Sequence, residues 1–183
     1  MIENMTMKNN VDLKDAIRSI PDFPKAGIVF RDITTLLSNP DAFAQTIDVM
    51  EGYCQKRKAT RLLAIESRGF LFGGALASRL GLGLAIVRKP GKLPGKTIKQ
   101  DYELEYGIDT IEMNTDAINK DDRVVVIDDL VATGGTLGAA CKLVEKAGGT
   151  VAGIAVLIDL AFLPWREKLK GYDILSLVKY DSE

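Results

Sequence analysis

The segment from Arg123 to Thr136, RVVVIDDLVATGGT, constrains the fold of this chain more than any other. Residues 124–127 are consecutive β-branched residues, and a short apolar run of this kind predicts a strand buried on both faces of a sheet. Asp128 and Asp129 follow where that strand should end. Two adjacent carboxylates would be costly inside a sheet, so we expect them at its carboxyl edge. Apolar residues at helical spacing over 137–146 then predict a helix.

The loop 132–136, with the sequence ATGGT, has the composition of an anion-binding site. Glycines allow the backbone to approach a ligand closely, and the N–H groups at a helix N-terminus bind anions. The hydroxyls of Thr133 and Thr136 add hydrogen-bond donors. The neighbouring carboxylates can accept hydrogen bonds from a vicinal diol or hold a metal-bound water, so the segment points to a ribose 5-phosphate. The alternative is a capped turn without a ligand, which would need neither the paired acids nor this loop.

Other kinds of site are excluded by what the sequence lacks. A Walker A loop requires a lysine that the 132–136 loop does not have, and the G-x-G-x-x-G dinucleotide motif is absent. Because the chain has no histidine, Ser-His and Cys-His catalysis and histidine metal sites are excluded. Cys54 and Cys141 form neither a disulfide framework nor a zinc spacing, so we expect free thiols.

Length and composition indicate one domain. The chain has 183 residues, of which 46% are hydrophobic, and this is enough for a substantial core. A net charge of −1 gives no indication of a nucleic-acid partner. Residues 1–10 are polar and lack the apolar part of a signal peptide, and no apolar run approaches the roughly 20 residues of a membrane span. We therefore expect a soluble, cytoplasmic protein with no membrane partner.

Apolar runs near residues 62, 84, 124, 151 and 174 predict five strands. They alternate mostly with helical patterns, which indicates an α/β fold with a mainly parallel central sheet and helices on both faces. Asp12 is expected to cap a first helix that ends at Pro21. A short helix is expected over 165–169.

A second strand, polar loop and helix occur around Glu66-Ser67-Arg68-Gly69. Arg68 would stand at the carboxyl edge of the sheet, where open α/β proteins bind ligands. Its guanidinium group suits a pyrophosphate. The alternative is an arginine that forms a surface salt bridge.

Residues 88–100, RKPGKLPGKTIKQ, contain five cations and no acid. Their glycines and prolines disfavour regular structure, and repulsion between like charges predicts a loop that is mobile until an anion binds. A solvated basic loop is the alternative. Residues 101–106 alternate as in a half-buried strand, and Gly107 would turn the chain back into 108–113 as a hairpin.

The segment VVVIDDLVATGGT closely resembles the phosphoribosyl-diphosphate motif of the type I phosphoribosyltransferases, and its ATGGT form is most similar to the adenine phosphoribosyltransferase family. The resemblance extends from about Phe23 to Leu169. It implies the type I phosphoribosyltransferase fold in a single domain, 1–183, with an N-terminal helix and base-binding hood at about 1–33. It also implies a flexible lid and hairpin at about 88–113.

The reaction implied is purine salvage, in which adenine and 5-phosphoribosyl 1-diphosphate give AMP and pyrophosphate. The resemblance makes Glu105 and Arg68 catalytic and suggests a homodimer. Mg²⁺ is expected as cofactor because of the donor's charge, held mainly by the diphosphate and by no direct protein ligand. The substrate-binding residues expected are Val29, Phe30, Arg31, Ser67, Arg88, Lys89, Lys92, Tyr106, Asp128, Asp129, Leu130, Ala132, Thr133, Gly134, Gly135, Thr136 and Leu160.

The choice of base is the least constrained part of this prediction. The residues alone predict that 28–30 form a strand covering part of the core. The resemblance instead implies that Val29, Phe30 and Arg31 bind the base. Enzymes of the superfamily that use 6-oxopurines carry a lysine near the strand predicted at 151–158. No lysine occurs here between Lys146 and Lys168, which favours adenine. Guanine, hypoxanthine or xanthine remain alternatives, as does a regulator that senses the donor. The family usually has aspartate where this chain has Glu66, so that residue's role is open.

Overall fold

The computed structural model describes residues 10–103 and 107–183. Contacts divide the chain into two compact units. The N-terminal unit comprises residues up to Val49 together with Glu183, and the sheet unit comprises Met50 to Ser182. The expectation that both form a single domain stays a prediction.

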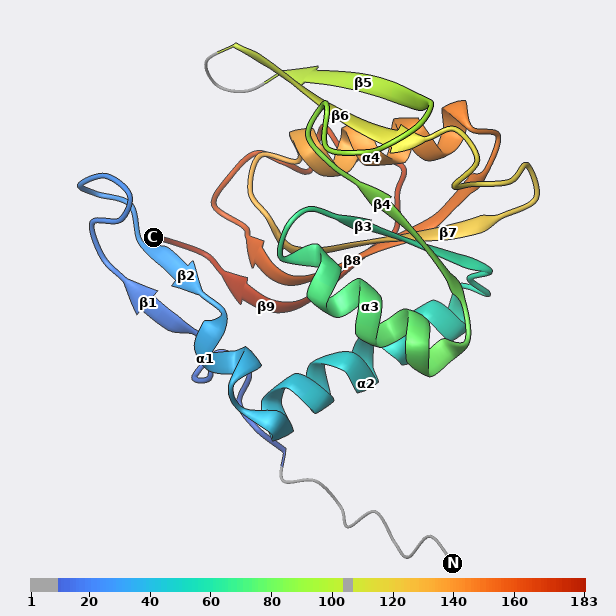
Figure 1. The fold of residues 1–183 in the computed structure, drawn as a ribbon. Coiled ribbons are helices and arrows are strands. Elements are labelled where there is room, and N and C mark those ends of the chain that lie inside the picture. Colours follow the sequence, from blue (N-terminus) through green and yellow to red (C-terminus); the bar gives the residue numbers. More distant parts are fainter. Residues whose placement is uncertain (1–9, 104–106) are drawn as a thin grey trace, which may run out of the picture. The chain divides into compact units, whose positions relative to one another are not determined.

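The sheet unit is built on a five-stranded, wholly parallel sheet of order β4-β3-β7-β8-β9 (Figure 1). All five predicted strands are confirmed. Their bounds are β3 Arg61–Ile65, β4 Gly83–Val87, β7 Arg123–Val131, β8 Thr150–Leu160 and β9 Ile174–Tyr180. Residues 124–127 of the central strand β7 are fully buried, as expected for a strand covered on both faces.

Helices cover both faces of this sheet (Figure 1). Alternate strand residues such as Leu63 and Val124 belong to the main core together with α4 (Gly135–Lys146). On the other face, α3 (Gly69–Leu80) approaches β3 so closely that a Cβ at Gly73 would lie 2.6 Å from that of Ala64. The C-terminal part of α2 (Pro40–Lys56) forms an ion pair with α3 through Glu51 and Arg79. This arrangement brings the carboxyl ends of β3 and β7 side by side.

An antiparallel hairpin, β5 (Thr97–Glu103) and β6 (Ile108–Asn114), packs beside α4 (Figure 1). The predicted hairpin is confirmed, although its first strand begins earlier than expected. Residues 97–100 were expected in an irregular basic loop, but they pair with 111–114. The long-range strand partner outweighs the local glycine and proline content. The expected short helix over 165–169 is also wrong, because these residues form turns.

In the N-terminal unit, β1 (Arg18–Ile20) pairs antiparallel with β2 (Phe30–Asp32), and the one-turn helix α1 (Thr34–Leu37) follows. The predicted helix from Asp12 is wrong. Asp12 does cap a turn, with its Oδ1 accepting the Lys14 N–H at 2.8 Å. The turn does not extend into a helix. The Thr35 hydroxyl donates a hydrogen bond to the Ala16 carbonyl at 2.7 Å, and the chain then enters β1. A short segment gains more from this pairing than from extending a costly helix nucleus.

Two expectations about the whole chain can be compared with the structure. Cys54 and Cys141 are free and buried, as predicted, and burial raises the pKa of each thiol to about 12. Within residues 10–103 and 107–183, no helix has both the length and the apolar character needed to cross a bilayer.

Candidate active site

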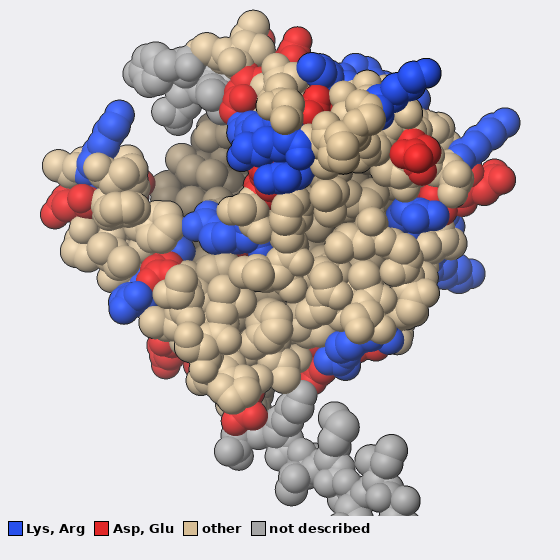
Figure 2. Space-filling view, in the orientation of Figure 1, with Lys and Arg blue, Asp and Glu red and all other residues tan. Residues whose placement is uncertain are grey.

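A pocket of about 400 Å³ lies at the carboxyl ends of β3 and β7. It brings together three segments that the sequence predicted separately, namely the 66–68 loop, the acidic pair and the 132–136 loop. Lys and Arg side chains also gather around the segment between β4 and β5 (Figure 2). The lining residues include Glu66, Ser67, Arg68, Lys89, Tyr102, Asp128, Asp129, Leu130, Ala132, Thr133, Gly134, Gly135 and Thr136.

The acidic pair stands at the floor of this pocket. Asp129 is 5% exposed and Asp128 is half-buried. Burial raises the pKa of Asp128, and the neighbouring charge of Asp129 raises it further. Burial also raises the pKa of Asp129, although the nearby Arg68 opposes this shift. Gly69 allows this packing, because a Cβ there would lie 3.0 Å from Asp128 Oδ1. The pair therefore sits where cationic or hydroxyl partners stabilise its charge.

Arg68 pairs with Asp129 inside the pocket, with Nε 2.7 Å from Oδ2. The Arg68 side chain is 37% exposed, whereas that of Asp129 is 7% exposed. Among the described residues, Asp129 Oδ2 has no partner with hydrogen-bond geometry. Hence this buried oxygen retains acceptor capacity, and the guanidinium keeps a face toward the pocket. Arg68 thus does form a salt bridge, and it does so within the pocket. Its role in binding a pyrophosphate stays a prediction.

The 132–136 loop leads directly into α4. Gly134 adopts φ +75°, a conformation that favours glycine, and its carbonyl accepts the Gly138 N–H at 2.9 Å. The N–H groups of the first turn have no acceptor within a helix, and the residues of this turn line the pocket. The predicted strand, loop and helix are confirmed in this order, but β7 continues through the acidic pair to Val131 and α4 already begins at Gly135. Binding of an anion by the loop stays a prediction.

Glu66, whose role the sequence left open, binds the basic segment 88–100. Glu66 Oε2 accepts a hydrogen bond from Arg88 Nε at 2.7 Å. Its Oε1 accepts the Lys89 N–H at 2.9 Å and Lys92 Nζ at 3.1 Å. Burial alone would raise the pKa of Glu66, but these donors outweigh it and lower the pKa to about 2. Glu66 thus anchors the loop beside the pocket.

A second carboxylate, that of Glu112 on β6, accepts hydrogen bonds from the same basic segment. Glu112 is 2% exposed and accepts the Gly91 N–H at 2.8 Å and the Thr97 hydroxyl at 3.1 Å. Lys89 Nζ in turn contacts Asp109 and donates to the Tyr102 hydroxyl at 2.9 Å. The loop itself contains cations and no acid, but acids outside it offset the repulsion between them. Its flexibility stays a prediction.

Some predicted site residues do not line this pocket. Arg88 and Lys92 donate hydrogen bonds to Glu66, and Leu160 ends β8 as a half-buried residue. Glu105 and Tyr106 lie outside the described residues, so their roles stay predictions.

Val29, Phe30 and Arg31 belong to the N-terminal unit. There the Phe30 ring packs edge-on against Phe23 at 5.2 Å, and Val29 N–H donates to Glu183 Oε2 at 3.1 Å. Arg31 donates to the Ser19 hydroxyl at 2.6 Å. Their contacts with a base stay predictions.

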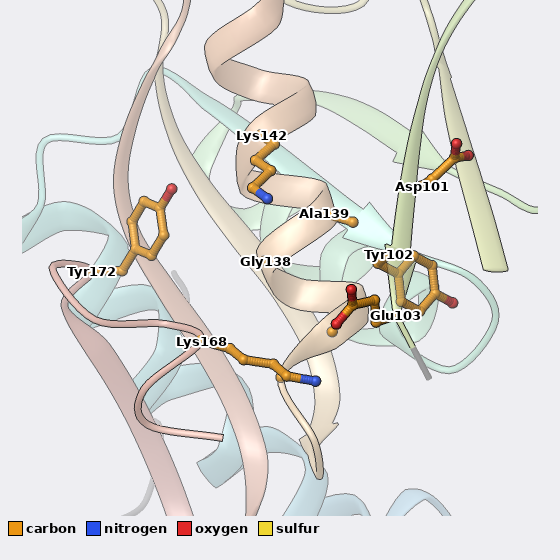
Figure 3. Close-up of a pocket in the computed structure, with 10 residues that line it drawn as sticks. Asp101, Tyr102, Glu103, Gly138, Ala139, Lys142, Lys168 and Tyr172 are labelled. Atoms are coloured by element: carbon orange, nitrogen blue, oxygen red, sulfur yellow. The ribbon is translucent and has the colours of Figure 1, made fainter. Parts of the chain in front are cut away.

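A further pocket of about 450 Å³ lies along α4 and shares Tyr102, Gly134 and Gly135 with the first (Figure 3). Figure 3 shows the β5 side chains on one side of the helix and Lys168 and Tyr172 on the other. The acidic pair and Arg68 do not line it. The chemistry predicted from the sequence is therefore concentrated in the pocket at the strand ends.

The chain is similar to known proteins over most of its length. Residues 32–172 match the phosphoribosyl transferase domain family. An adenine phosphoribosyltransferase of Caldanaerobacter subterraneus subsp. tengcongensis is 53% identical over 169 residues, which cover 92% of this chain and 98% of that protein. The crystal structure of adenine phosphoribosyltransferase from Thermoanaerobacter pseudethanolicus has a TM-score of 0.89 at 52% identity and covers 92% of this chain and 98% of its own.

The crystal structure of the Saccharomyces cerevisiae adenine phosphoribosyltransferase has a TM-score of 0.86 at 39% identity, covering 91% of this chain and 96% of its own. It is a complex with D-2,5-dideoxy-2,5-imino-altritol 1,6-bisphosphate and adenine. The family match includes the whole pocket at the ends of β3 and β7. The predicted type I phosphoribosyltransferase fold is thereby confirmed, and the chain belongs to the phosphoribosyltransferases and, within them, to the adenine phosphoribosyltransferase family.

Proposed function

We propose that this pocket transfers the 5-phosphoribosyl group of 5-phosphoribosyl 1-diphosphate to adenine, giving AMP and pyrophosphate in purine salvage. The observation that carries the proposal is the convergence of an anion-binding loop, an acidic pair and Arg68 in one pocket. These groups match the 5-phosphate, the ribose diol and the diphosphate of one donor molecule. The yeast relative bound to adenine and a bisphosphate supports the same pair of ligand types.

The donor's sugar would be held from two directions. The 132–136 loop grips the 5-phosphate with the N–H groups of the first turn of α4 and the hydroxyls of Thr133 and Thr136. Asp128 and Asp129 accept hydrogen bonds from the ribose hydroxyls, and Asp129 Oδ2 has the acceptor capacity for this. Displacement at the anomeric carbon develops positive charge on the sugar, and the two carboxylates stabilise that charge.

The diphosphate leaving group would be stabilised by cations that line the same pocket. Arg68 lines the pocket and its guanidinium suits a pyrophosphate. Lys89 lines it too, while Glu66 holds Arg88 and Lys92 nearby.

Mg²⁺ is proposed to arrive with the donor. Within the described residues, no group of three or more His, Cys, Asp or Glu side chains could hold a metal ion. Asp128 and Asp129 can instead accept hydrogen bonds from water bound to an ion that the diphosphate carries. The ion supplies charge neutralisation, and the protein supplies positioning.

The base-binding half of the reaction rests on a second set of predicted residues. Adenine would stack on Phe30, with backbone contacts from Val29 and Arg31, and base stacking of this kind contributes about 1–3 kcal/mol. Glu105 would manage a proton on the base, and Leu160 would contribute apolar surface. We further propose one catalytic domain spanning both units, a homodimer and a cytoplasmic location, which the two buried free thiols fit.

The test is to incubate the protein with the donor, Mg²⁺ and adenine, guanine, hypoxanthine or xanthine, and to follow pyrophosphate release. Release with adenine alone is expected. Asp129→Asn should lower this release, whereas Asp173→Asn, at the amino end of β9, should leave it unchanged. Release with guanine or xanthine only would refute adenine as the substrate. No release with any base would refute the transferase and favour a regulator that binds the donor.

A further inference from the structure

Trp165 lies directly behind the phosphate-binding loop and is held there by Asp159. The indole Nε1 donates to Asp159 Oδ1 at 2.8 Å. Both residues are buried, with Trp165 6% exposed and Asp159 3% exposed. Asp159 stands near the carboxyl end of β8 and pairs in register with Val131 of β7. The hydrogen bond therefore ties the 165–169 turn to the same sheet edge that carries the pocket.

The 165–169 turn approaches the loop closely at Gly134. A Cβ at Gly134 would lie 3.2 Å from Trp165 Cβ and 3.2 Å from its carbonyl oxygen. At Gly138 a Cβ would lie 3.6 Å from Leu169 Cδ2. Figure 3 shows Lys168, from the same turn, beside α4 at Gly138. Gly134 lets the turn pack tightly against the backbone that would hold the 5-phosphate, whereas the distance at Gly138 is an ordinary van der Waals contact.

Arg166 completes this support. Its guanidinium lies 4.3 Å from the centre of the Trp165 ring and donates to Asp159 Oδ2 at 3.0 Å. Both oxygens of Asp159 are thus engaged, one by the indole and one by the guanidinium. A side chain with its ring covered and its N–H paired has little freedom to rotate.

We propose that Trp165 and Asp159 are positioning residues that set the conformation of the 5-phosphate loop through Gly134. This inference rests on the proposed function, because it concerns how the same site holds its donor. Neither residue lines the pocket, so their effect is on the loop backbone. A binding group must be held to within a fraction of an ångström, and the packed indole provides that constraint.

The kinetic test is Trp165→Phe, which keeps a ring but removes the N–H. The expected result is a rise of roughly tenfold in the KM for 5-phosphoribosyl 1-diphosphate, with kcat and the KM for adenine changed less than twofold. Asp159→Asn keeps the oxygen that accepts the indole N–H, so the expected rise is smaller than for Asp159→Ala. The matched control is Tyr53→Phe, which removes a 2.7 Å bond between an aromatic side chain and Asp173 at the amino end of β9. The control should leave the donor KM unchanged.

A second measurement does not depend on turnover. Trp165 is the only tryptophan in the sequence, so intrinsic emission reports this position alone. Titration of the wild-type protein with ribose 5-phosphate should shift or quench the emission in a saturable way. If Trp165→Phe does not fold, this titration and the Asp159→Ala kinetics carry the test.

An unchanged donor KM in Trp165→Phe or, if that variant does not fold, in Asp159→Ala would overturn the inference. So would an emission that does not respond to saturating ribose 5-phosphate. Both outcomes differ from failure of the proposed function, which is a wild-type protein that releases no pyrophosphate.

Discussion

Arg68 Nε lies 2.7 Å from Asp129 Oδ2, so the group proposed for the leaving diphosphate is paired with a group proposed for the ribose. Asp129 is almost fully buried, and its charge would be costly without this partner. The donor brings hydroxyl groups for Asp129 and anionic oxygens for Arg68. Binding can therefore exchange one internal ion pair for two contacts with the same ligand.

Arg68→Ala should lower kcat/KM by roughly 10²- to 10³-fold, because a cation aimed at developing charge is lost. Arg79→Ala serves as the control, since Arg79 has a similar exposure of 42% and pairs with Glu51 away from the pocket. Steady-state kinetics with the donor as varied substrate would distinguish the two. Normal turnover with a lowered melting temperature in Arg68→Ala would contradict the assignment.

Asp128→Asn should weaken use of the donor by about 1.5–3 kcal/mol, or roughly 10- to 150-fold in kcat/KM. The same change should raise the melting temperature at neutral pH. Because the pKa of Asp128 is raised by burial and by Asp129, its stabilising contribution is greatest below the ordinary value of 3.8. That contribution is lost as the pH rises through the raised pKa.

Thermal unfolding of Asp128→Asn and wild type between pH 4 and 8 measures this effect. The variant's advantage should be larger at pH 8 than at pH 4. Equal melting temperatures at pH 8 would show that Asp128 is not under the electrostatic strain inferred from its burial.

Glu66→Gln should destabilise the protein in a defined pH range. The pKa of Glu66 is lowered from 4.5 to about 2, so its stabilising contribution is present above about pH 4.5. It is lost as the pH falls toward 2. Urea unfolding at pH 7, 5, 4 and 3 should show a deficit that narrows below pH 4.5, while the exposed Glu167→Gln shows no such trend. A deficit that does not depend on pH would falsify the charge-based account of the loop anchor.

Gly134→Ala should cost about 1–2 kcal/mol of stability, because a left-handed conformation at φ +75° is strained for alanine. The added Cβ also presses on Trp165, so the donor KM should rise. Gly74→Ala on the exposed face of α3 is the matched control, since a Cβ there meets nothing within 4 Å. The control should stabilise the protein by about 0.5–1 kcal/mol, since alanine is the better helix former. Equal stability of the two variants would argue against a strained loop.

The local part of the architecture was readable from the sequence. A run of consecutive apolar residues indicates a buried strand, and a polar loop after such a run must lie at the edge of the sheet. For this reason the acidic pair, Arg68 and the 132–136 loop were predicted correctly as neighbours. Where a short segment had competing options, as at Asp12 and at residues 97–100, the local pattern failed because a strand partner outside the segment decided the outcome.

What the sequence determined by itself was the parallel sheet, the order of its elements and the chemistry gathered at one edge. Only the tertiary structure decided which charges meet. Glu66 and Glu112 anchor the basic loop from 22 and 21 positions away along the chain. Trp165, in the turn that follows β8, packs against Gly134, which lies 31 positions earlier in the chain. Such pairings depend on which strands become neighbours, and side-chain spacing within a segment carries no record of that choice.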